Sequence, residues 1–111
     1  MCVVNLGRRI KGPIVAWKLL ELDHGRLTGI QGFEYKIGKT YTSSPPGFQA
    51  FVNKEDAEQA QMAKWPYYVV RKVFLYNARK GVIENMDGFS DGKPGWAASK
   101  IRIPRKGAKA K

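Results

Sequence analysis

The chain has 111 residues, of which 43% are hydrophobic and 26% charged, and this composition predicts one globular domain rather than a disordered chain. No apolar run approaches the roughly 20 residues of a membrane span, and the first apolar stretch is too short and too charged for a secretory signal. Cys2 is the only cysteine, which excludes an intramolecular disulfide and a cysteine-built zinc site. We therefore expect a cytoplasmic protein with no membrane contact, no metal and no cofactor.

The net charge of +11 is concentrated at the two ends of the chain. Residues 1–11 and 93–111 hold basic side chains and no acid, whereas residues 12–92 are almost neutral. Basic ends of this kind bind polyanions by releasing counterions, with little sequence preference. The charge predicts nucleic acid, a nucleoprotein or another acidic partner, and a solvated surface without a partner is the alternative.

The first half of the chain predicts short strands. Residues 14–22 fit a strand or a short helix, and the turn residues at 23–25 favour a hairpin. Three further apolar pieces predict strands on either side of a loop rich in serine and proline: 33–35, 39–42 and 48–52.

One helix is expected at about residues 54–64. Asn53 is a good N-cap residue, and the acids that follow favour the positive end of the helix dipole. Ala57, Ala60 and Ala63 recur at spacing three, so we expect the helix to lie close against a sheet. Pro66 stops it.

The second half of the chain returns to strands. Residues 67–76 are apolar on both faces and predict a central strand, followed by a turn at 77–81 that leads into residues 82–83. Residues 85–95 predict a loop. The last strand, 96–103, alternates, with Trp96, Ala98, Lys100 and Arg102 expected on one face and the intervening residues on the other.

This order of elements predicts an α+β fold, a mostly antiparallel sheet with one helix packed on one face. We expect a basic N-terminal segment at 1–11, a single domain at 12–103 and a basic flexible tail at 104–111, because the tail has no apolar side chain larger than alanine.

Three motifs are incomplete. Gly38-Lys39-Thr40 ends like a phosphate-binding loop, but Phe33 stands where that motif needs its first glycine. Residues 47–52 are similar to an RNA-recognition signature, yet Phe48 and Phe51 are three apart and face opposite ways in a strand. His24 is read as a surface turn residue, and Asp87 and Asp91 as loop residues. The sequence therefore predicts no catalytic residue and no enzyme activity.

Residues 41–43, Tyr-Thr-Ser, resemble an element of ADP-ribosyltransferases. That resemblance implies an acid and an earlier basic residue, for which Glu84 and either Arg26 or His24 are the candidates. It remains a minor alternative.

The preferred hypothesis is a small, non-enzymatic, basic binding protein. Trp96 is included because an aromatic ring between cations can stack on a base or anchor an interface. The predicted contact residues are Arg8, Arg9, Lys11, Trp96, Lys100, Arg102, Arg105 and Lys106. The alternative is an inhibitor of a host defence system, similar to an anti-CRISPR protein, that binds an acidic protein surface.

Three stretches, Gly32–Tyr41, Gly47–Phe51 and Ala97–Ile103, together resemble a small uncharacterised domain of bacteriophage and prophage proteins over residues 31–103. The resemblance implies a phage-encoded protein in the host cytoplasm and supplies no mechanism. Members often carry a histidine and a cysteine in the second stretch, where this chain has Gln49 and Phe51, so metal or thiol chemistry does not carry over.

Overall fold

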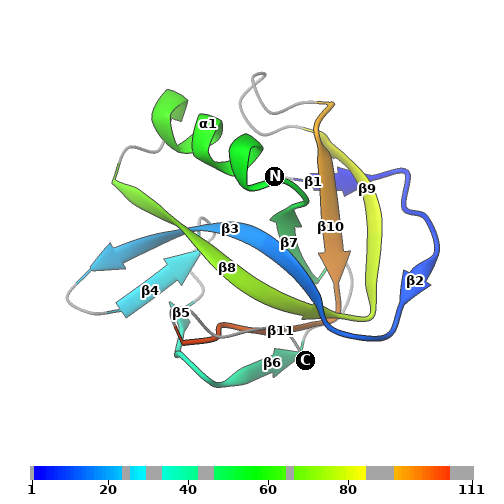
Figure 1. The fold of residues 1–111 in the computed structure, drawn as a ribbon, viewed down its shortest axis with the longest axis horizontal. Helices are drawn as coiled ribbons and strands as arrows, with labels where there is room; N and C mark the ends of the chain where they lie inside the picture. The colour runs from blue at the N-terminus through cyan, green and yellow to red at the C-terminus, as the bar shows by residue number, and fades with distance from the viewer. Residues whose placement is uncertain are drawn as a thin grey trace.

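Eleven strands and one helix make up the part of the chain that this computed structural model describes, which is residues 2–23, 26–29, 34–42, 47–64, 67–84 and 92–105. Figure 1 labels the elements, which are β1 (Cys2–Val4), β2 (Arg9–Ile10), β3 (Ile14–Asp23), β4 (Arg26–Gly29), β5 (Glu34–Tyr35), β6 (Thr40–Thr42), β7 (Phe48–Phe51), α1 (Lys54–Lys64), β8 (Tyr68–Tyr76), β9 (Ala78–Glu84), β10 (Pro94–Ala98) and β11 (Lys100–Arg102). The predicted α+β class is wrong, because the described residues form an essentially all-β fold with a single helix of 11 residues.

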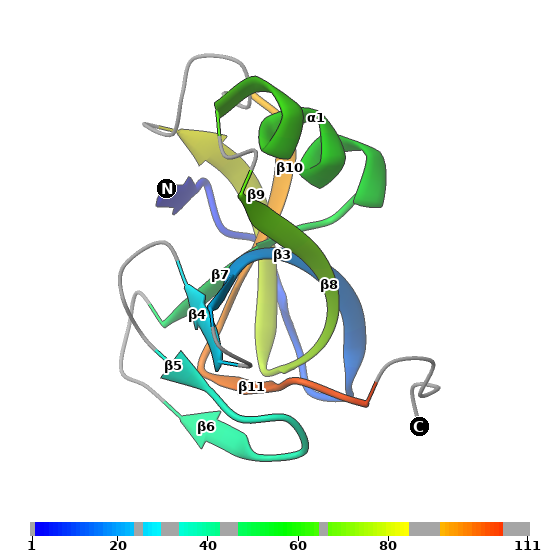
Figure 2. The same cartoon turned by 90° about the vertical axis from the view of Figure 1, so that its left-hand side faces the viewer.

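The strands form one antiparallel sheet in the order β1-β9-β10-β7-β3-β8-β11-β6. Three short strands lie off this path. β2 pairs with β9. β4 pairs with the edge of β3 opposite β8, and β5 pairs with β4. Figure 2 shows that the sheet is strongly curved, and Figure 1 shows that the consecutive strands β8 and β9 meet at a corner and then diverge. β8 has β3 on one side and β11 on the other, as expected of a central strand.

The helix α1 has the predicted bounds and covers one end of the sheet (Figure 1). The Ala57 amide donates to the Asn53 carbonyl, which is the first bond of the helix. Ala57 and Ala60 are fully buried in a cluster that includes Phe51 of β7. Ala63 is exposed, because a period of 3.6 residues turns it away from the face of the other two. No helix among the described residues has the length and apolar character to cross a membrane.

A single residue, Asn77, makes the corner between β8 and β9. Its φ is +55°, in the left-handed region that asparagine tolerates better than most residues. The predicted turn at 77–81 is therefore wrong, since residues 78–81 already belong to β9. Gly81 fits there because β1 passes close by: a Cβ at this position would lie 2.3 Å from the Val4 carbonyl oxygen.

The chain between β10 and β11 changes face at Ser99. Trp96 and Ala98 of β10 pack in the same buried cluster as Ile101 of β11, which strict alternation along one strand forbids. The expected grouping of Trp96 with Lys100 and Arg102 is therefore wrong. The break at Ser99 turns the indole into the core while the two cations face outward.

Candidate nucleic-acid interface

The outward face of β8 and β11 carries a group of cations and aromatic rings in register. Lys100 lies directly opposite Tyr76, and Arg102 lies directly opposite Phe74. Lys72 occupies the same face of β8, two residues before Phe74. We call this group the cation–aromatic face, and it consists of Lys72, Phe74, Tyr76, Lys100 and Arg102.

Each cation on this face lies over a ring. The Lys100 ammonium is 5.3 Å from the centre of the Tyr76 ring. The Arg102 guanidinium and the Lys72 ammonium are 5.6 and 5.8 Å from the centre of the Phe74 ring. Contacts of this kind contribute roughly 0.5–1 kcal/mol at exposed sites. They hold the cations against the sheet without neutralising their charge.

The two rings differ in what they offer a ligand. Phe74 is 1% exposed, so its ring is covered and serves to seat the cations. Tyr76 is only half-buried, so part of its side chain is accessible to solvent. Tyr76 is therefore the ring of this face on which a planar group can stack.

The described residues paired with this face on β6 and β3 carry no negative charge. On β6, Thr42 lies opposite Lys100 and Thr40 lies opposite Arg102. On β3, Val15 lies opposite Phe74 and Trp17 lies opposite Lys72. The face is therefore a positively charged strip with polar and apolar borders.

Arg102 is incompletely satisfied. Its Nε atom is buried and has no hydrogen-bond partner among the described residues. Desolvating part of a guanidinium without an acceptor costs free energy. An anion bound to the remainder of the group would offset that cost, so the local environment favours an anionic ligand.

A different cation, Lys18 of β3, is turned inward. Its ammonium donates to the Gln49 carbonyl at 2.6 Å and lies 5.9 Å from the centre of the Tyr35 ring. Burial lowers the pKa of Lys18 to about 8, because the charged form loses its hydration. Burial, and secondarily the neighbouring Tyr41, raise the pKa of Tyr35 to about 12. Lys18 therefore belongs to the core and not to the outward positive surface.

The predicted contact residues fall into separate groups. Lys100 and Arg102 lie together on the cation–aromatic face. Arg8, Arg9 and Lys11 are exposed on the N-terminal segment beside β9, and Arg105 is exposed after β11. Trp96 is 9% exposed and packs in the core, so its indole does not reach the surface for stacking. Lys106 lies outside the described residues.

The sequence reasoning missed two residues of this face, Lys72 and Tyr76. Their positions were visible, because Lys72, Phe74 and Tyr76 alternate on one face of residues 67–76. The apolar residues between them suggested burial on both sides. A cation and two aromatic residues that follow one another at every second position of a single strand were the pattern that could have identified the face.

The residues proposed for an ADP-ribosyltransferase site are not brought together. Arg26 is on β4, Tyr41 on β6 and Glu84 on β9, and none of these strands pairs with another of the three. The Tyr41 hydroxyl accepts a hydrogen bond from the Lys36 amide. His24, Ser43, Asp87 and Asp91 lie outside the described residues. Within the described ranges, no three His, Cys, Asp or Glu side chains are grouped to hold a metal ion.

The incomplete motifs have ordinary structural roles. Gly38 adopts a φ of +82° in the turn before β6, and its amide donates to the Ile103 carbonyl. Phe48 and Phe51 enter different buried clusters, which confirms that they face opposite sides of β7. No protein-family model, no curated protein and no solved structure matches this chain.

Proposed function

We propose that this protein is a non-enzymatic, phage-encoded binding protein for single-stranded nucleic acid, which it holds on the cation–aromatic face. The observation that carries the proposal is the cross-strand pairing of Lys100 with Tyr76 and of Arg102 with Phe74. Cations interleaved with aromatic rings on one sheet face suit a polymer that alternates phosphates with planar bases.

The cations supply affinity in this proposal. Lys100 and Arg102 are two residues apart on one strand, so their backbones are separated by roughly 7 Å. That separation is comparable with the distance between successive phosphates of an extended strand. The exposed cations of the N-terminal segment, with Arg105 and Lys106, extend the same electrostatic attraction without adding sequence preference.

Tyr76 accounts for the preference for single strands. Its side chain is only half-buried, and stacking of a base on an aromatic ring contributes roughly 1–3 kcal/mol. A duplex keeps its bases stacked on each other, so it can use only the cations. We therefore expect weaker binding of duplex DNA than of single-stranded DNA or RNA of equal length.

The test is a fluorescence-anisotropy titration of the full chain with labelled single-stranded DNA, single-stranded RNA and duplex DNA, all with 5′-hydroxyl ends. The double variant Lys100→Gln/Arg102→Gln should bind single strands about tenfold more weakly, and its salt slope should fall by about 1.4, because two phosphate contacts are lost. The charge-matched control is Arg26→Gln/Lys80→Gln, in which both altered residues are exposed and lie off this face.

Equal losses in the two double variants would mean that net charge alone drives binding, and the cation–aromatic face would be rejected as the site. No binding to any of the three polymers by the wild-type chain would reject nucleic acid as the ligand. The alternative, inhibition of a host defence complex through an acidic protein surface, would then be the function to test.

A further inference from the structure

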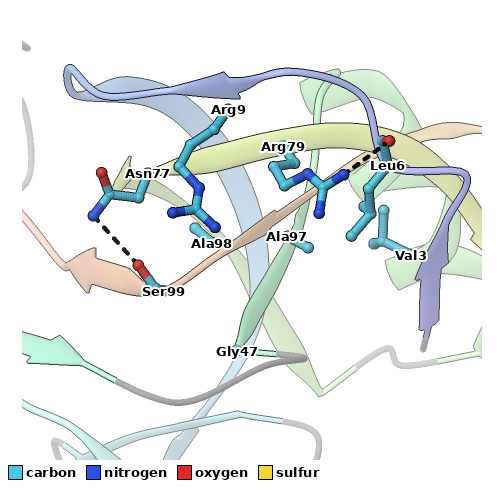
Figure 3. Close-up of a pocket in the computed structure, with 9 residues that line it drawn as sticks. All are labelled: Val3, Leu6, Arg9, Gly47, Asn77, Arg79, Ala97, Ala98 and Ser99. Carbon is cyan, nitrogen blue, oxygen red and sulfur yellow. Dashed lines mark hydrogen bonds between the residues drawn. The ribbon is translucent and has the colours of Figure 1, made fainter.

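A small basic pocket lies away from the cation–aromatic face, between the N-terminal segment and the strands β9 and β10. It has a volume of about 100 Å³. Figure 3 shows the guanidinium groups of Arg9 and Arg79 above a floor formed by Ala97 and Ala98. None of the described residues that line the pocket is acidic.

Two like charges oppose each other across this pocket. Arg9 of β2 and Arg79 of β9 are direct partners in the antiparallel register. Like charges in directly opposite positions destabilise a strand pair. An anion bound between the two guanidinium groups would convert this repulsion into attraction.

Arg79 is fixed in place by the backbone. Its Nε donates to the Gly7 carbonyl at 2.8 Å, and its Nη2 donates to the Leu6 carbonyl at 3.2 Å. A guanidinium has five N–H donors, so donors remain after these two bonds. The exposed Arg9 side chain makes no hydrogen bond or ion pair with any other described residue, and its guanidinium is directed over the pocket (Figure 3). Arg79 is therefore held in place as part of the pocket wall, and the Arg9 side chain is available to a ligand.

The opposite side of the pocket supplies neutral donors. The Asn77 side-chain amide donates to the Ser99 hydroxyl at 3.4 Å, which leaves the hydroxyl hydrogen of Ser99 unused by this bond. The left-handed conformation of Asn77 places its side chain at the corner of β8 and β9. Gly47 completes this side, where a Cβ would lie 2.2 Å from the Ala98 carbonyl oxygen, so no larger residue fits.

We propose that this pocket is a binding site for a phosphoryl group. Two guanidinium groups, a hydroxyl and an amide around a small cavity without carboxylates match the charge and the tetrahedral acceptors of phosphate. The group can come from inorganic phosphate or from the terminal phosphate of a larger molecule. The site uses none of the five residues of the cation–aromatic face, so it goes beyond the proposed function and does not depend on it.

The first test is calorimetric titration of the full chain with inorganic phosphate, against a chloride titration at matched ionic strength. Phosphate should bind with one-to-one stoichiometry and chloride should not. Arg9→Gln should weaken phosphate binding at least tenfold. Arg8→Gln removes the same charge from the neighbouring exposed residue, which does not line the pocket, and should change the affinity less than twofold.

The site is rejected if phosphate gives no more heat than chloride, or if Arg8→Gln and Arg9→Gln weaken binding equally. Ser99→Ala provides a second variant that keeps the charge, and a loss of about threefold is expected. The double variant Lys100→Gln/Arg102→Gln should leave phosphate binding unchanged, so failure of this proposal and failure of the proposed function are distinguishable.

A comparison of 5′-phosphorylated with 5′-hydroxyl oligonucleotides identifies the source of the group. If the pocket takes a terminal phosphate, the phosphorylated strand binds more tightly to the wild-type chain, and the difference disappears in Arg9→Gln. If the two strands bind equally while inorganic phosphate still binds, the pocket takes the free ion. Either result supports a phosphoryl site.

Discussion

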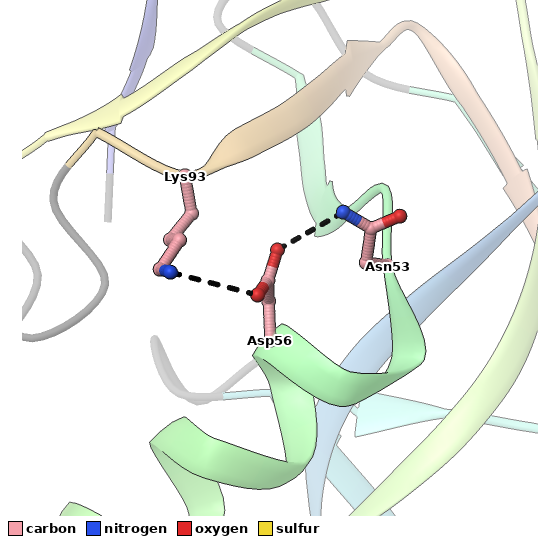
Figure 4. A network of polar contacts seen from close by, with 3 residues as sticks. All are labelled: Asn53, Asp56 and Lys93. Carbon is pink, nitrogen blue, oxygen red and sulfur yellow. Dashed lines mark hydrogen bonds and ion pairs between the residues drawn. The ribbon is translucent and has the colours of Figure 1, made fainter.

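Cations on the two sides of Ser99 have different partners. Before it, Lys93 approaches the Asp56 carboxylate of α1 at 4.0 Å, and the Asn53 side chain donates to the same carboxylate at 3.1 Å (Figure 4). After it, Lys100 and Arg102 lie over aromatic rings. A carboxylate neutralises a cation, whereas a ring positions it and leaves its full charge available to an anion. A basic side chain is therefore paired with an acid of the helix in one region, and in the other region its charge remains available to a ligand.

The comparison implies that packing rather than the Lys93–Asp56 pair holds α1 on the sheet. Phe51 is 1% exposed and lies in one cluster with Ala57 and Ala60. Phe51→Ala should lower the free energy of unfolding by about 3–5 kcal/mol, since it leaves a cavity beneath the helix. Urea denaturation followed by circular dichroism measures this. A loss below about 1 kcal/mol would show that the helix does not depend on this contact.

Lys18 extends the comparison to a cation whose partner is a carbonyl. The pKa of Lys18 in the folded chain, about 8, lies below its ordinary value of 10.5, so the unfolded chain holds more protons between these two pH values. The free energy of unfolding should therefore rise with pH across that range, by at most about 3 kcal/mol.

In Lys18→Met this rise should be absent, so the stability of the variant relative to the wild-type chain should be greatest below pH 8 and should decline toward pH 10. Denaturation at a series of pH values measures the slope. The control is Lys36→Met, in which the replaced side chain is exposed. A constant difference between Lys18→Met and the wild-type chain would contradict the low pKa.

A substitution at Tyr76 tests the role of the ring separately from that of Lys100, which lies over it. Tyr76→Leu should weaken single-stranded DNA binding about fivefold to tenfold, because base stacking is lost, and should change duplex binding less than twofold. Tyr67→Leu is the control, since Tyr67 is 87% exposed and precedes β8. Equal losses of affinity for single-stranded and duplex DNA would contradict base stacking and would show that the Tyr76 ring serves only to position Lys100.

The smallest effect is expected at Lys93. Its side chain is 44% exposed, and exposed ion pairs contribute about 0–1 kcal/mol. Lys93→Gln should therefore lower the free energy of unfolding by less than about 1 kcal/mol and leave nucleic-acid affinity within twofold of wild type. A tenfold loss of affinity in Lys93→Gln would show that Lys93 contributes to nucleic-acid binding as Lys100 and Arg102 do, and would contradict the comparison.

Local patterns in the sequence predicted the elements that local chemistry determines. The helix at 54–64 follows from its N-cap, its first-turn acids and Pro66, and the central strand follows from the apolar alternation of residues 68–76. The strands of two or three residues in the N-terminal segment, β1 and β2, carry no such pattern. They exist because distant strands offer them hydrogen-bond partners, and overlooking them is what led to an α+β class instead of an all-β one.

Only part of the candidate site was predicted, because the rest depends on contacts between strands that are distant in the sequence. Lys100 and Arg102 were singled out by the charge of the C-terminal region, but their partners Phe74 and Tyr76 come from another strand. Trp96 was misassigned because one residue, Ser99, shifts the alternation, and nothing in its neighbours distinguishes a continuous strand from a broken one. Cross-strand register and single-residue breaks are tertiary properties.

The pairing of β1 with β9 also sets the order in which the chain can fold. Cys2 pairs with Glu84 and Val4 with Val82, so the first strand has no partner until most of the chain has been synthesised. The entropy of closing such a long loop must be lost before its hydrogen bonds form, which places this topology among slow folders, on a scale of roughly milliseconds to seconds. On the ribosome, β1 and β2 therefore stay unpaired beside a polyanion for most of translation, and they can pair only after β9 has been synthesised.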